Sequence, residues 1–406
     1  MRAPDAPKTV FIPRMSDHAV TVAAAMRAHD VAAQVLPASD DETLAIGLRH
    51  CAGRECAPCF TCTGDILRRA RQPGFDPAAS VLFMPTTAGP CRFGQYATLL
   101  REVLDVQGLR KLEIASPSGA NSYRDFSAKP ARLRAAMWQG VVAVDLLVKL
   151  LHEYRPYEIE PGSADAVYRR GLDRVAEAVE RGGGRRTAEA LRAVAVEFVG
   201  LAIDRSDPRP RIGLVGEIYV RFNTFSNQHI VRQVEAAGGE VTVASLMEWV
   251  YFTNWQTMAH AKANGAYREF VRMYLTDRYQ AWTEHRLVAA VADALRYRSE
   301  APTARLMANI RPYYEPSLGT EAVLSMGKAI EFAHSGVSGI LSIMPFSCMP
   351  GIVVAGMAPR IRADLEHIPW LDVIYAVQGG TNIRTRLEAF MHQARQFQRR
   401  RVGRTG

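Results

Sequence analysis

Short apolar runs alternate with helical patterns in two stretches of this chain, and this alternation restricts the fold more than any other feature. Helical spacing is expected at about residues 17–29, 64–70 and 93–107 of the first 125 residues. Uniformly apolar strands joined by helices predict a parallel sheet that is covered on both faces. We therefore expect a doubly wound α/β domain here. Its strands fall at residues 10–12, 33–36, 81–84 and 112–115.

The same alternation returns in the second half of the chain, with strands expected at residues 211–216, 241–244, 339–344 and 371–376. Between the halves, apolar residues at three- and four-residue spacing predict helices at 132–151, 164–180 and 187–202. The sequence thus predicts three parts. These are a cysteine-rich α/β domain over residues 1–130, a helical linker over 131–206, and a second α/β domain over 207–406 with a helical insertion at about 255–300 and a basic C-terminal tail.

Composition argues against several other classes of protein. Hydrophobic residues make up 48% and charged residues 22% of the chain, as in ordinary globular proteins. No apolar stretch reaches the roughly 18 uncharged residues that a membrane-spanning helix needs. The net charge of +9 comes almost wholly from scattered arginines, without a basic stripe interleaved with aromatic residues, which argues against nucleic-acid binding. The arginine-rich end at residues 395–404 is expected to be a solvated, frayed terminus.

The placement of cysteine is the strongest indication of chemistry. Thiolates at C-x2-C-x2-C spacing can converge on one small inorganic centre. A folded protein has little other reason to put most of its cysteines into one loop, so the pattern favours an iron–sulfur cluster. Four of the six cysteines lie within twelve residues, at Cys51, Cys56, Cys59 and Cys62, and the other two, Cys91 and Cys348, each follow an apolar run.

Three other uses of these cysteines stay open. Disulfides are disfavoured because a chain of 406 residues can bury a large core and does not need cross-links for stability. In addition, residues 1–14 do not resemble a signal peptide. The chain is therefore expected in the reducing cytoplasm. Structural zinc also uses C-x2-C, but it usually takes a second knuckle of Cys or His, which is not obvious here. Buried thiols without any metal are the third alternative.

A short sequence pattern recurs in the two α/β halves. Met-Pro ends a strand at residues 84–85 and again at 344–345, and a cysteine follows each within a few residues. In open α/β sheets, ligands bind outside the carboxyl ends of the strands. Two such domains facing one another would bring Cys91 and Cys348 to one cleft, together with Cys56.

Five strings, GREC, MPTTAGPCRFGQY, GEIYVRFNTFSN, MPFSCMPG and QGGTN, occur in this order. Together they resemble the 2-hydroxyacyl-CoA dehydratase family, and more narrowly its subfamily associated with CoA-substrate-specific activase ATPases. The wider family includes benzoyl-CoA reductase subunits and double-cubane cluster proteins, and the resemblance extends over about residues 10–391. It implies two flavodoxin-like α/β domains with an iron–sulfur cluster between them. It also implies that a separate ATP-hydrolysing activator supplies the electrons.

The resemblance carries three cysteines over as cluster ligands: Cys56 of GREC, Cys91 of GPCRFGQY and Cys348 of FSCMPG. Three thiolates would leave one iron open to a substrate oxygen, which is how the dehydratases of this family use it. A single [4Fe-4S] cluster is favoured, and a double cubane held by all six cysteines stays open. The further thiols are those of Cys51, Cys59 and Cys62.

Several polar residues are weaker candidates for contacts with a cluster or a substrate. Arg54 and Arg92 flank cysteines and would hydrogen-bond cluster sulfides, although surface ion pairs explain them equally well. Polar residues after the strand at 211–216 would point into the mouth of the cleft, but such residues also suit helix caps. These residues are Glu217, Asn223, Ser226 and Asn227. A turn before the last helix would offer backbone N–H groups to an anion, or would merely begin the helix: Gly379, Gly380, Thr381 and Asn382.

The leading hypothesis is an iron–sulfur redox protein that acts as a lyase or reductase on a small molecule, with a CoA thioester as one candidate. The chain contains no G-x-x-x-x-G-K-[ST] loop, so ATP hydrolysis is expected on another polypeptide. A non-catalytic, cluster-bearing relay or scaffold subunit is the alternative. A zinc-stabilised α/β binding protein is the third reading. A homodimer or heterodimer is compatible with each of them, and the sequence identifies no catalytic residue.

Overall fold

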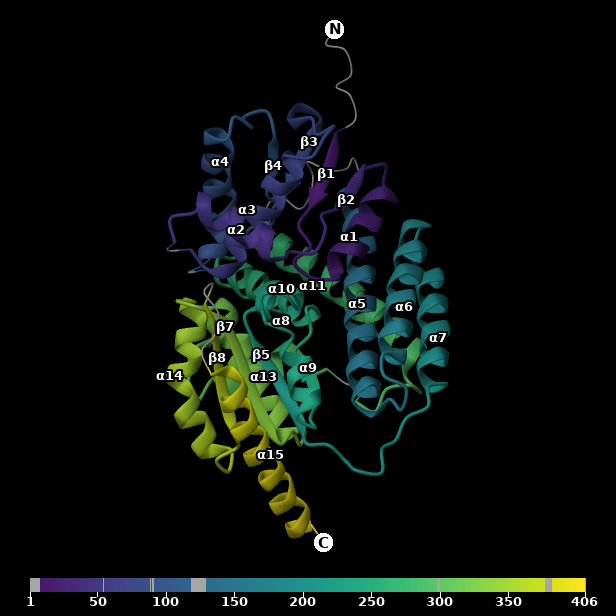
Figure 1. The fold of residues 1–406 in the computed structure, drawn as a ribbon, viewed down its shortest axis with the longest axis vertical. Coiled ribbons are helices and arrows are strands. Elements are labelled where there is room, and N and C mark those ends of the chain that lie inside the picture. Colours follow the sequence, from purple (N-terminus) through teal and green to yellow (C-terminus); the bar gives the residue numbers. More distant parts are fainter. Residues whose placement is uncertain are drawn as a thin grey trace. The chain divides into compact units, whose positions relative to one another are not determined.

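The chain forms two compact α/β units, and each is built on a four-stranded sheet (Figure 1). The computed structural model describes residues 8–53, 55–87, 89, 91–117, 129–297, 300–376 and 382–405. The first unit comprises residues 1–144 and 172–187, and the second comprises residues 145–171 and 188–406. Every strand pair in both sheets is parallel, which confirms the expected α/β class.

The first sheet has the strand order β2-β1-β3-β4. Val10 of β1 pairs with Ala33 on one side and with Val81 on the other. A first strand that lies between the second and the third is the flavodoxin-type order, whose switch point falls between β1 and β3. The strands are β1 (Thr9–Ile12), β2 (Ala33–Val35), β3 (Ser80–Phe83) and β4 (Glu113–Ala115).

Two helices of the first unit differ from the expectation. α2 (Asp41–His50) has no counterpart among the expected helices, and Asp40 caps it by accepting a hydrogen bond from the Thr43 N–H at 3.0 Å. α3 (Ala57–Ala70) begins well before residue 64, because Pro58 suits the first turn of a helix. The remaining elements are α1 (His18–Arg27), η1 (Pro77–Ala79), η2 (Arg92–Gln95) and α4 (Tyr96–Val106).

The second sheet repeats the same topology in the order β6-β5-β7-β8. Gly213 of β5 pairs with Thr242 on one side and with Ile340 on the other. The prediction of two flavodoxin-like α/β folds is therefore confirmed at the level of architecture. The strands are β5 (Arg211–Gly216), β6 (Glu240–Val243), β7 (Gly339–Pro345) and β8 (Trp370–Tyr375).

The basic end of the chain is helical, which corrects the expectation of a frayed tail. α15 (Ile383–Thr405) continues through the arginine-rich stretch. It does so because Phe397 is buried in the core of the second unit, and because Arg395 donates a hydrogen bond to the carbonyl of Ala237. The other helices of this unit are α8 (Ile218–Phe222), α9 (Ile230–Ala236), α10 (Met247–Ala263), α11 (Tyr267–Val291), α12 (Thr303–Ile310), η4 (Pro316–Leu318), α13 (Thr320–His334) and α14 (Met349–Asp364).

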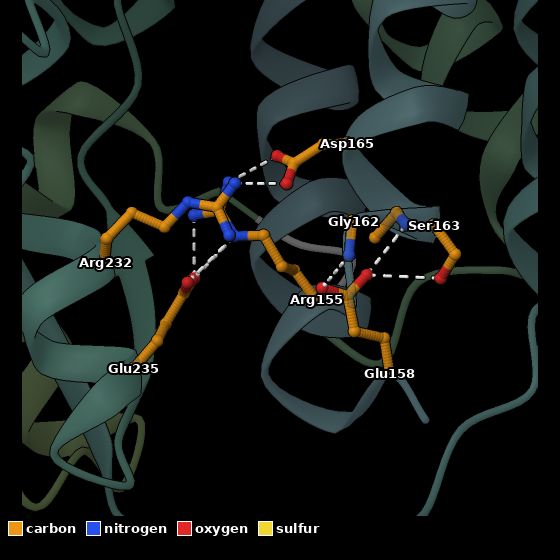
Figure 2. A network of polar contacts seen from close by, with 8 residues as sticks. Arg155, Glu158, Gly162, Ser163, Asp165, Arg232 and Glu235 are labelled. Atoms are coloured by element: carbon orange, nitrogen blue, oxygen red, sulfur yellow. Dashed lines mark hydrogen bonds and ion pairs between the residues drawn. The ribbon is translucent and has the colours of Figure 1, made fainter. Parts of the chain in front are cut away.

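Between the two sheets in sequence lie α5 (Pro130–Tyr154), η3 (Arg155–Tyr157), α6 (Ser163–Glu180) and α7 (Arg185–Val199). A buried arginine fastens this segment to α9 within the second unit (Figure 2). Arg155 donates to Glu235 from Nη2 at 2.8 Å and to Asp165 from Nη1 at 3.2 Å. Arg232 pairs with the same Asp165, so two arginines and two carboxylates balance one another inside the fold.

One segment among the described residues is long and apolar enough to cross a membrane by composition alone. It runs over Pro130–Tyr157, with a mean hydropathy of 1.3 in its most apolar window. Two thirds of that window, 67%, is buried inside the structure, which is typical of the core helix of a soluble α/β protein.

Candidate metal centre

The cysteine-rich segment of the first unit spans the end of α2 and the beginning of α3, and these two helices pack with their backbones in close contact. A Cβ atom added at Gly47 of α2 would lie 1.9 Å from the carbonyl oxygen of Phe60, and one at Gly64 of α3 would lie 1.8 Å from that of Thr43. Only glycine permits such an approach. The close packing brings the end of α2, where Cys51 is the C-cap residue, against the first turns of α3.

Three cysteines occupy the beginning of α3 rather than a loop. Cys56 is the N-cap residue, with extended backbone angles, and its carbonyl accepts a hydrogen bond from the N–H of Cys59 at 2.9 Å. Cys59 and Cys62 lie inside the helix and are each only 1% exposed. Residues three apart lie on neighbouring parts of one helix face, so the C-x2-C-x2-C spacing keeps the three sulfurs on one side.

Cys51 completes a group of four thiols in the first unit. Its sulfur lies 3.7 Å from Oγ1 of Thr63. A hydrogen bond with Cys51, together with burial and the nearby Cys51, Cys62 and Cys56, raises the pKa of Cys59 far above its ordinary value. The same hydrogen bond from Cys59 lowers the pKa of Cys51. Of this pair, Cys51 is thus the thiol that ionises more readily, and Cys59 keeps its proton.

Cys91 begins the segment that follows β3. It is the N-cap residue of η2 and is partly buried. η2 leads directly into α4, whose first residue, Tyr96, places its hydroxyl 2.6 Å from the sulfur of Cys56. This contact fixes the segment that starts with Cys91 beside the beginning of α3.

The sixth cysteine belongs to the second unit. Cys348 follows β7, is 7% exposed, and is the N-cap residue of α14. Both Cys56 and Cys348 therefore precede a helix and are followed two residues later by proline, at Pro58 and Pro350. The convergence of Cys348 with Cys56 and Cys91 stays a prediction.

The side chains present are of the right type to bind a metal through thiolate sulfur. All six cysteines are free thiols, and four of them are gathered around the beginning of α3 in the first unit. Within the described ranges, however, no three side chains of His, Cys, Asp or Glu are arranged to hold a metal ion together. Three residues close in sequence to Cys56 and Cys91 lie outside the described residues: Arg54, Ala88 and Pro90. The structure thus gathers the thiols of the first unit without presenting them as a finished ligand set.

The other candidate residues have mostly local roles. The carboxylate of Glu217 caps α8 by accepting hydrogen bonds from the N–H groups of Tyr219 and Val220 at 3.1 and 2.8 Å. Asn223 accepts from the N–H of Ser226 at 2.9 Å, and Asn227 donates to the carbonyl of Val220 at 2.8 Å. These contacts support the interpretation of these polar residues as helix and turn caps rather than as ligand-binding residues.

The remaining candidates divide between described and undescribed positions. Arg92 is the first residue of η2 and is partly exposed. Asn382 has a φ of 60°, and its carbonyl accepts the N–H of Arg386 in the first turn of α15. Three of the turn residues, Gly379, Gly380 and Thr381, lie outside the described residues.

We expect Gly64→Ala to disrupt the cysteine group by forcing α3 away from α2. Overpacking of this kind costs about 1–3 kcal/mol, so the free energy of unfolding should fall by that amount. Thermal unfolding followed by circular dichroism measures the loss. Gly356→Ala in α14 is the matched control, because an added Cβ there has open space and alanine favours the helix. Equal melting temperatures for Gly64→Ala and the wild type would contradict the close approach.

Sequence reasoning did not find two features near these sites. Tyr96 ends the MPTTAGPCRFGQY string, but that string gives no sign that its hydroxyl contacts Cys56. Glu321 of α13 lies close enough to Glu217 for the charge of Glu217 to raise the pKa of Glu321. Both contacts join residues that are distant in the chain, so no local sequence pattern predicts them. Comparison with known proteins adds no relative, because no family model and no curated protein matches this sequence.

Proposed function

We propose that this chain is an iron–sulfur protein of the 2-hydroxyacyl-CoA dehydratase type, which receives low-potential electrons from a separate ATP-hydrolysing partner. The observation that carries the proposal is the gathering of Cys51, Cys56, Cys59 and Cys62 around the beginning of α3. So many interacting thiols in one small region suit a sulfur-ligated metal better than isolated packing.

The chain's own residues would hold such a group in three ways. Cys56 and Cys348 sit at helix N-termini, where the partial positive charge of the helix favours a negatively charged ligand. Burial of Cys59 and Cys62 keeps water away from their sulfurs. The hydroxyl of Tyr96 offers a hydrogen bond to the sulfur of Cys56, a contact that tunes the potential of iron–sulfur sites. A bound cluster would supply single electrons at low potential.

The proposed reaction is reductive or radical chemistry on a small molecule, with a CoA thioester as the candidate substrate class. The chain has no phosphate-binding G-x-x-x-x-G-K-[ST] loop, which supports an ATPase partner in trans. We place the protein in the cytoplasm, where thiols stay reduced. The purified chain should therefore show no robust ATP turnover by itself.

The deciding experiment measures iron, acid-labile sulfide and zinc in protein purified without oxygen, with an electron paramagnetic resonance spectrum after reduction. About four irons per chain would indicate one cubane, and about eight would recruit all six cysteines. Zinc without labile sulfide would overturn the redox proposal.

Single variants assign the ligands in the same assay. We expect Cys56→Ser, Cys91→Ser and Cys348→Ser each to lose most of the iron, because every one removes a thiolate ligand. Thr61→Ser, a conservative change between Cys59 and Cys62, is the control and should retain the full iron content. Full iron content in Cys348→Ser would limit the centre to the first unit. A spectral change on adding acyl-CoA thioesters would favour catalysis over electron relay.

A further inference from the structure

Arginine and tyrosine side chains gather at the amino edge of the second sheet. Arg211 is the first residue of β5, and it pairs in register with Glu240, the first residue of β6. This edge is opposite to the carboxyl edge, where Cys348 follows β7. We call the group the arginine–tyrosine cluster, and its members are Arg205, Arg209, Arg211, Arg296, Tyr154, Tyr157 and Tyr297.

Three of these arginines surround one buried ring. The guanidinium carbons of Arg205, Arg209 and Arg296 lie 5.4, 5.5 and 6.0 Å from the centre of the Tyr157 ring. Arg205 also lies over Tyr154, at 5.0 Å from the centre of that ring. Three positive charges are thereby held around a single side chain.

Tyr297 holds the fourth arginine beside Arg296. The guanidinium carbons of Arg211 and Arg296 lie 3.8 and 5.1 Å from the centre of the Tyr297 ring. Arg211 is 8% exposed, and its Nε has no hydrogen-bond partner in the part of the chain that the structure describes. The same holds for Nε of Arg205. Because native proteins pair nearly all such shielded donors, the cluster contains fewer acceptors than its guanidinium groups need.

The cluster also contains few carboxylate partners. Of the four arginines, only Arg296 forms an ion pair within the described ranges of the chain, with Glu240 at 3.0 Å. The other three donate to main-chain carbonyl oxygens instead, Arg205 to Glu153, Arg209 to Glu235 and Arg211 to Ser335.

Nearby carboxylates are engaged elsewhere. That of Glu235 binds Arg155, as Figure 2 shows. The carboxylate of Glu153 accepts the main-chain N–H groups of residues 296 and 297 at 2.7 and 3.3 Å. Asp204, next to Arg205 in the chain, accepts from the N–H of Ser206 at 2.8 Å. Glu153 and Glu240 together supply two negative charges against the four positive charges of the cluster.

The tyrosine rings position the arginines without cancelling their charge. A ring face attracts a guanidinium group through its quadrupole, whereas a carboxylate would neutralise the group. The side chain of Arg296 is 38% exposed, and Arg205 and Arg209 are partly exposed. Three positively charged groups of the cluster are therefore accessible to an anion from solution.

We infer that Arg205, Arg209 and Arg296 bind the diphosphate group of a small molecule. Each guanidinium group binds phosphate oxygens through paired, charge-assisted hydrogen bonds. A monophosphate offers too few oxygens for three such groups, whereas a diphosphate offers enough and also neutralises the excess charge. The site lies wholly in the second unit, at the edge of the sheet opposite to Cys348, and stands independently of the iron–sulfur proposal.

Isothermal titration calorimetry of the purified chain tests the inference with inorganic diphosphate, inorganic phosphate and ADP. We expect diphosphate to bind at least about tenfold more tightly than phosphate, because it engages more of the guanidinium groups. ADP binding at least as tightly as diphosphate would identify a nucleotide as the source of the group, and weaker ADP binding would identify free diphosphate. Equal affinities for phosphate and diphosphate, or no saturable binding of diphosphate, would overturn the inference.

Variants identify the arginines. Arg205→Met and Arg209→Met should each weaken diphosphate binding about tenfold, because each removes charge-assisted donors. Arg360→Met is the matched control. Arg360 lies 5.5 Å from the centre of the Tyr313 ring and donates to a main-chain carbonyl, as Arg209 does, but it stands outside the cluster. Unchanged binding in Arg209→Met, or an equal loss in Arg360→Met, would contradict the site even if Arg205→Met fails to fold.

Competition with poly(dT) separates a small ligand from a nucleic acid. Proteins that bind single strands follow the backbone along an extended basic groove with stacking aromatic residues, whereas three guanidinium groups at one point suit a compact anion. We expect poly(dT) not to displace diphosphate at equal phosphate concentration. Displacement would overturn the inference in favour of a nucleic-acid site.

Discussion

Lys328→Met should lower the free energy of unfolding by about 3–5 kcal/mol, because it leaves buried carboxylates without their cation. Lys328 of α13 forms ion pairs with Glu248 of α10 and with Glu300. The side chain of Lys328 is 4% exposed and that of Glu248 is 7% exposed. Burial alone would lower the pKa of Lys328, but the charges of the two glutamates outweigh it and raise that pKa.

Glu300 retains a second cation in this variant, because Lys149 of α5 also pairs with it. Glu248 has no second ion pair in the part of the chain that the structure describes, and only the charge of Arg221 acts on it besides Lys328 as an opposing cation, so most of the loss should come from its buried carboxylate. Burial already raises the pKa of Glu248 to about 7 in the intact cluster. The variant should therefore be least destabilised in mildly acidic solution, where Glu248 takes up a proton.

Urea unfolding followed by tryptophan fluorescence measures the effect, because four of the five tryptophans lie in the second unit: Trp249, Trp255, Trp282 and Trp370. The double variant Lys328→Met/Glu248→Leu should recover most of the stability, since a buried ion pair is often replaced by apolar groups at little cost. Arg384→Met is the control, because the Arg384–Glu388 pair is exposed. A loss below about 0.5 kcal/mol in Lys328→Met, the usual effect of a surface substitution, would contradict a buried triad.

Asp65→Asn should stabilise the first unit by up to about 4 kcal/mol at pH 8, and should change its stability little at pH 4. Asp65 of α3 is 3% exposed. One of its oxygens accepts a hydrogen bond from Ser39 at 2.9 Å, and the other, Oδ1, has no partner among the described groups. Burial raises the pKa of Asp65 from 3.8 to about 7, against the opposing effects of Ser39 and Arg68.

The direction of the pH effect follows from this shift. Between pH 3.8 and about 7 the folded protein holds a proton on Asp65 that the unfolded chain has released. The stability contributed by that proton is fully present below pH 3.8 and is lost as the pH rises to about 7. Asparagine cannot ionise, so this loss should disappear in the variant.

Denaturant unfolding at a series of pH values, followed by circular dichroism, measures the difference between wild type and variant. Asp41→Asn is the matched control, because Asp41 lies exposed in the first turn of α2. A stability difference for Asp65→Asn that stays constant from pH 4 to pH 8 would show that Asp65 is ionised throughout.

The repeated strands were predictable from the sequence because each is a local apolar run. All eight expected strands match observed ones to within one or two residues, from Thr9–Ile12 to Trp370–Tyr375. The start of α3 was harder to place, because Cys56, Ala57 and Pro58 look like a metal-binding loop as much as a helix start. α2 was missed for a similar reason, since its amphipathic pattern is short and its beginning depends on the cap at Asp40.

For the candidate site, the sequence predicted which cysteines belong together but not how they are arranged. Cys56, Cys59 and Cys62 could be grouped from their spacing, and local helix geometry keeps such spacings on one face. Their contact with Cys51 depends on the packing of α2 against α3 at Gly47 and Gly64, which no spacing rule supplies.

The sequence by itself determined the strands, most of the helices, and the residue types available for metal binding, because these depend on neighbours within a few positions. Tertiary structure decided which side chains meet. The contact of Cys56 with Tyr96, the pairing of Lys328 with Glu248, and the meeting of Glu217 with Glu321 were all decided in this way. Each depends on strand order and helix packing, so residues far apart in the chain become neighbours only when the whole unit folds.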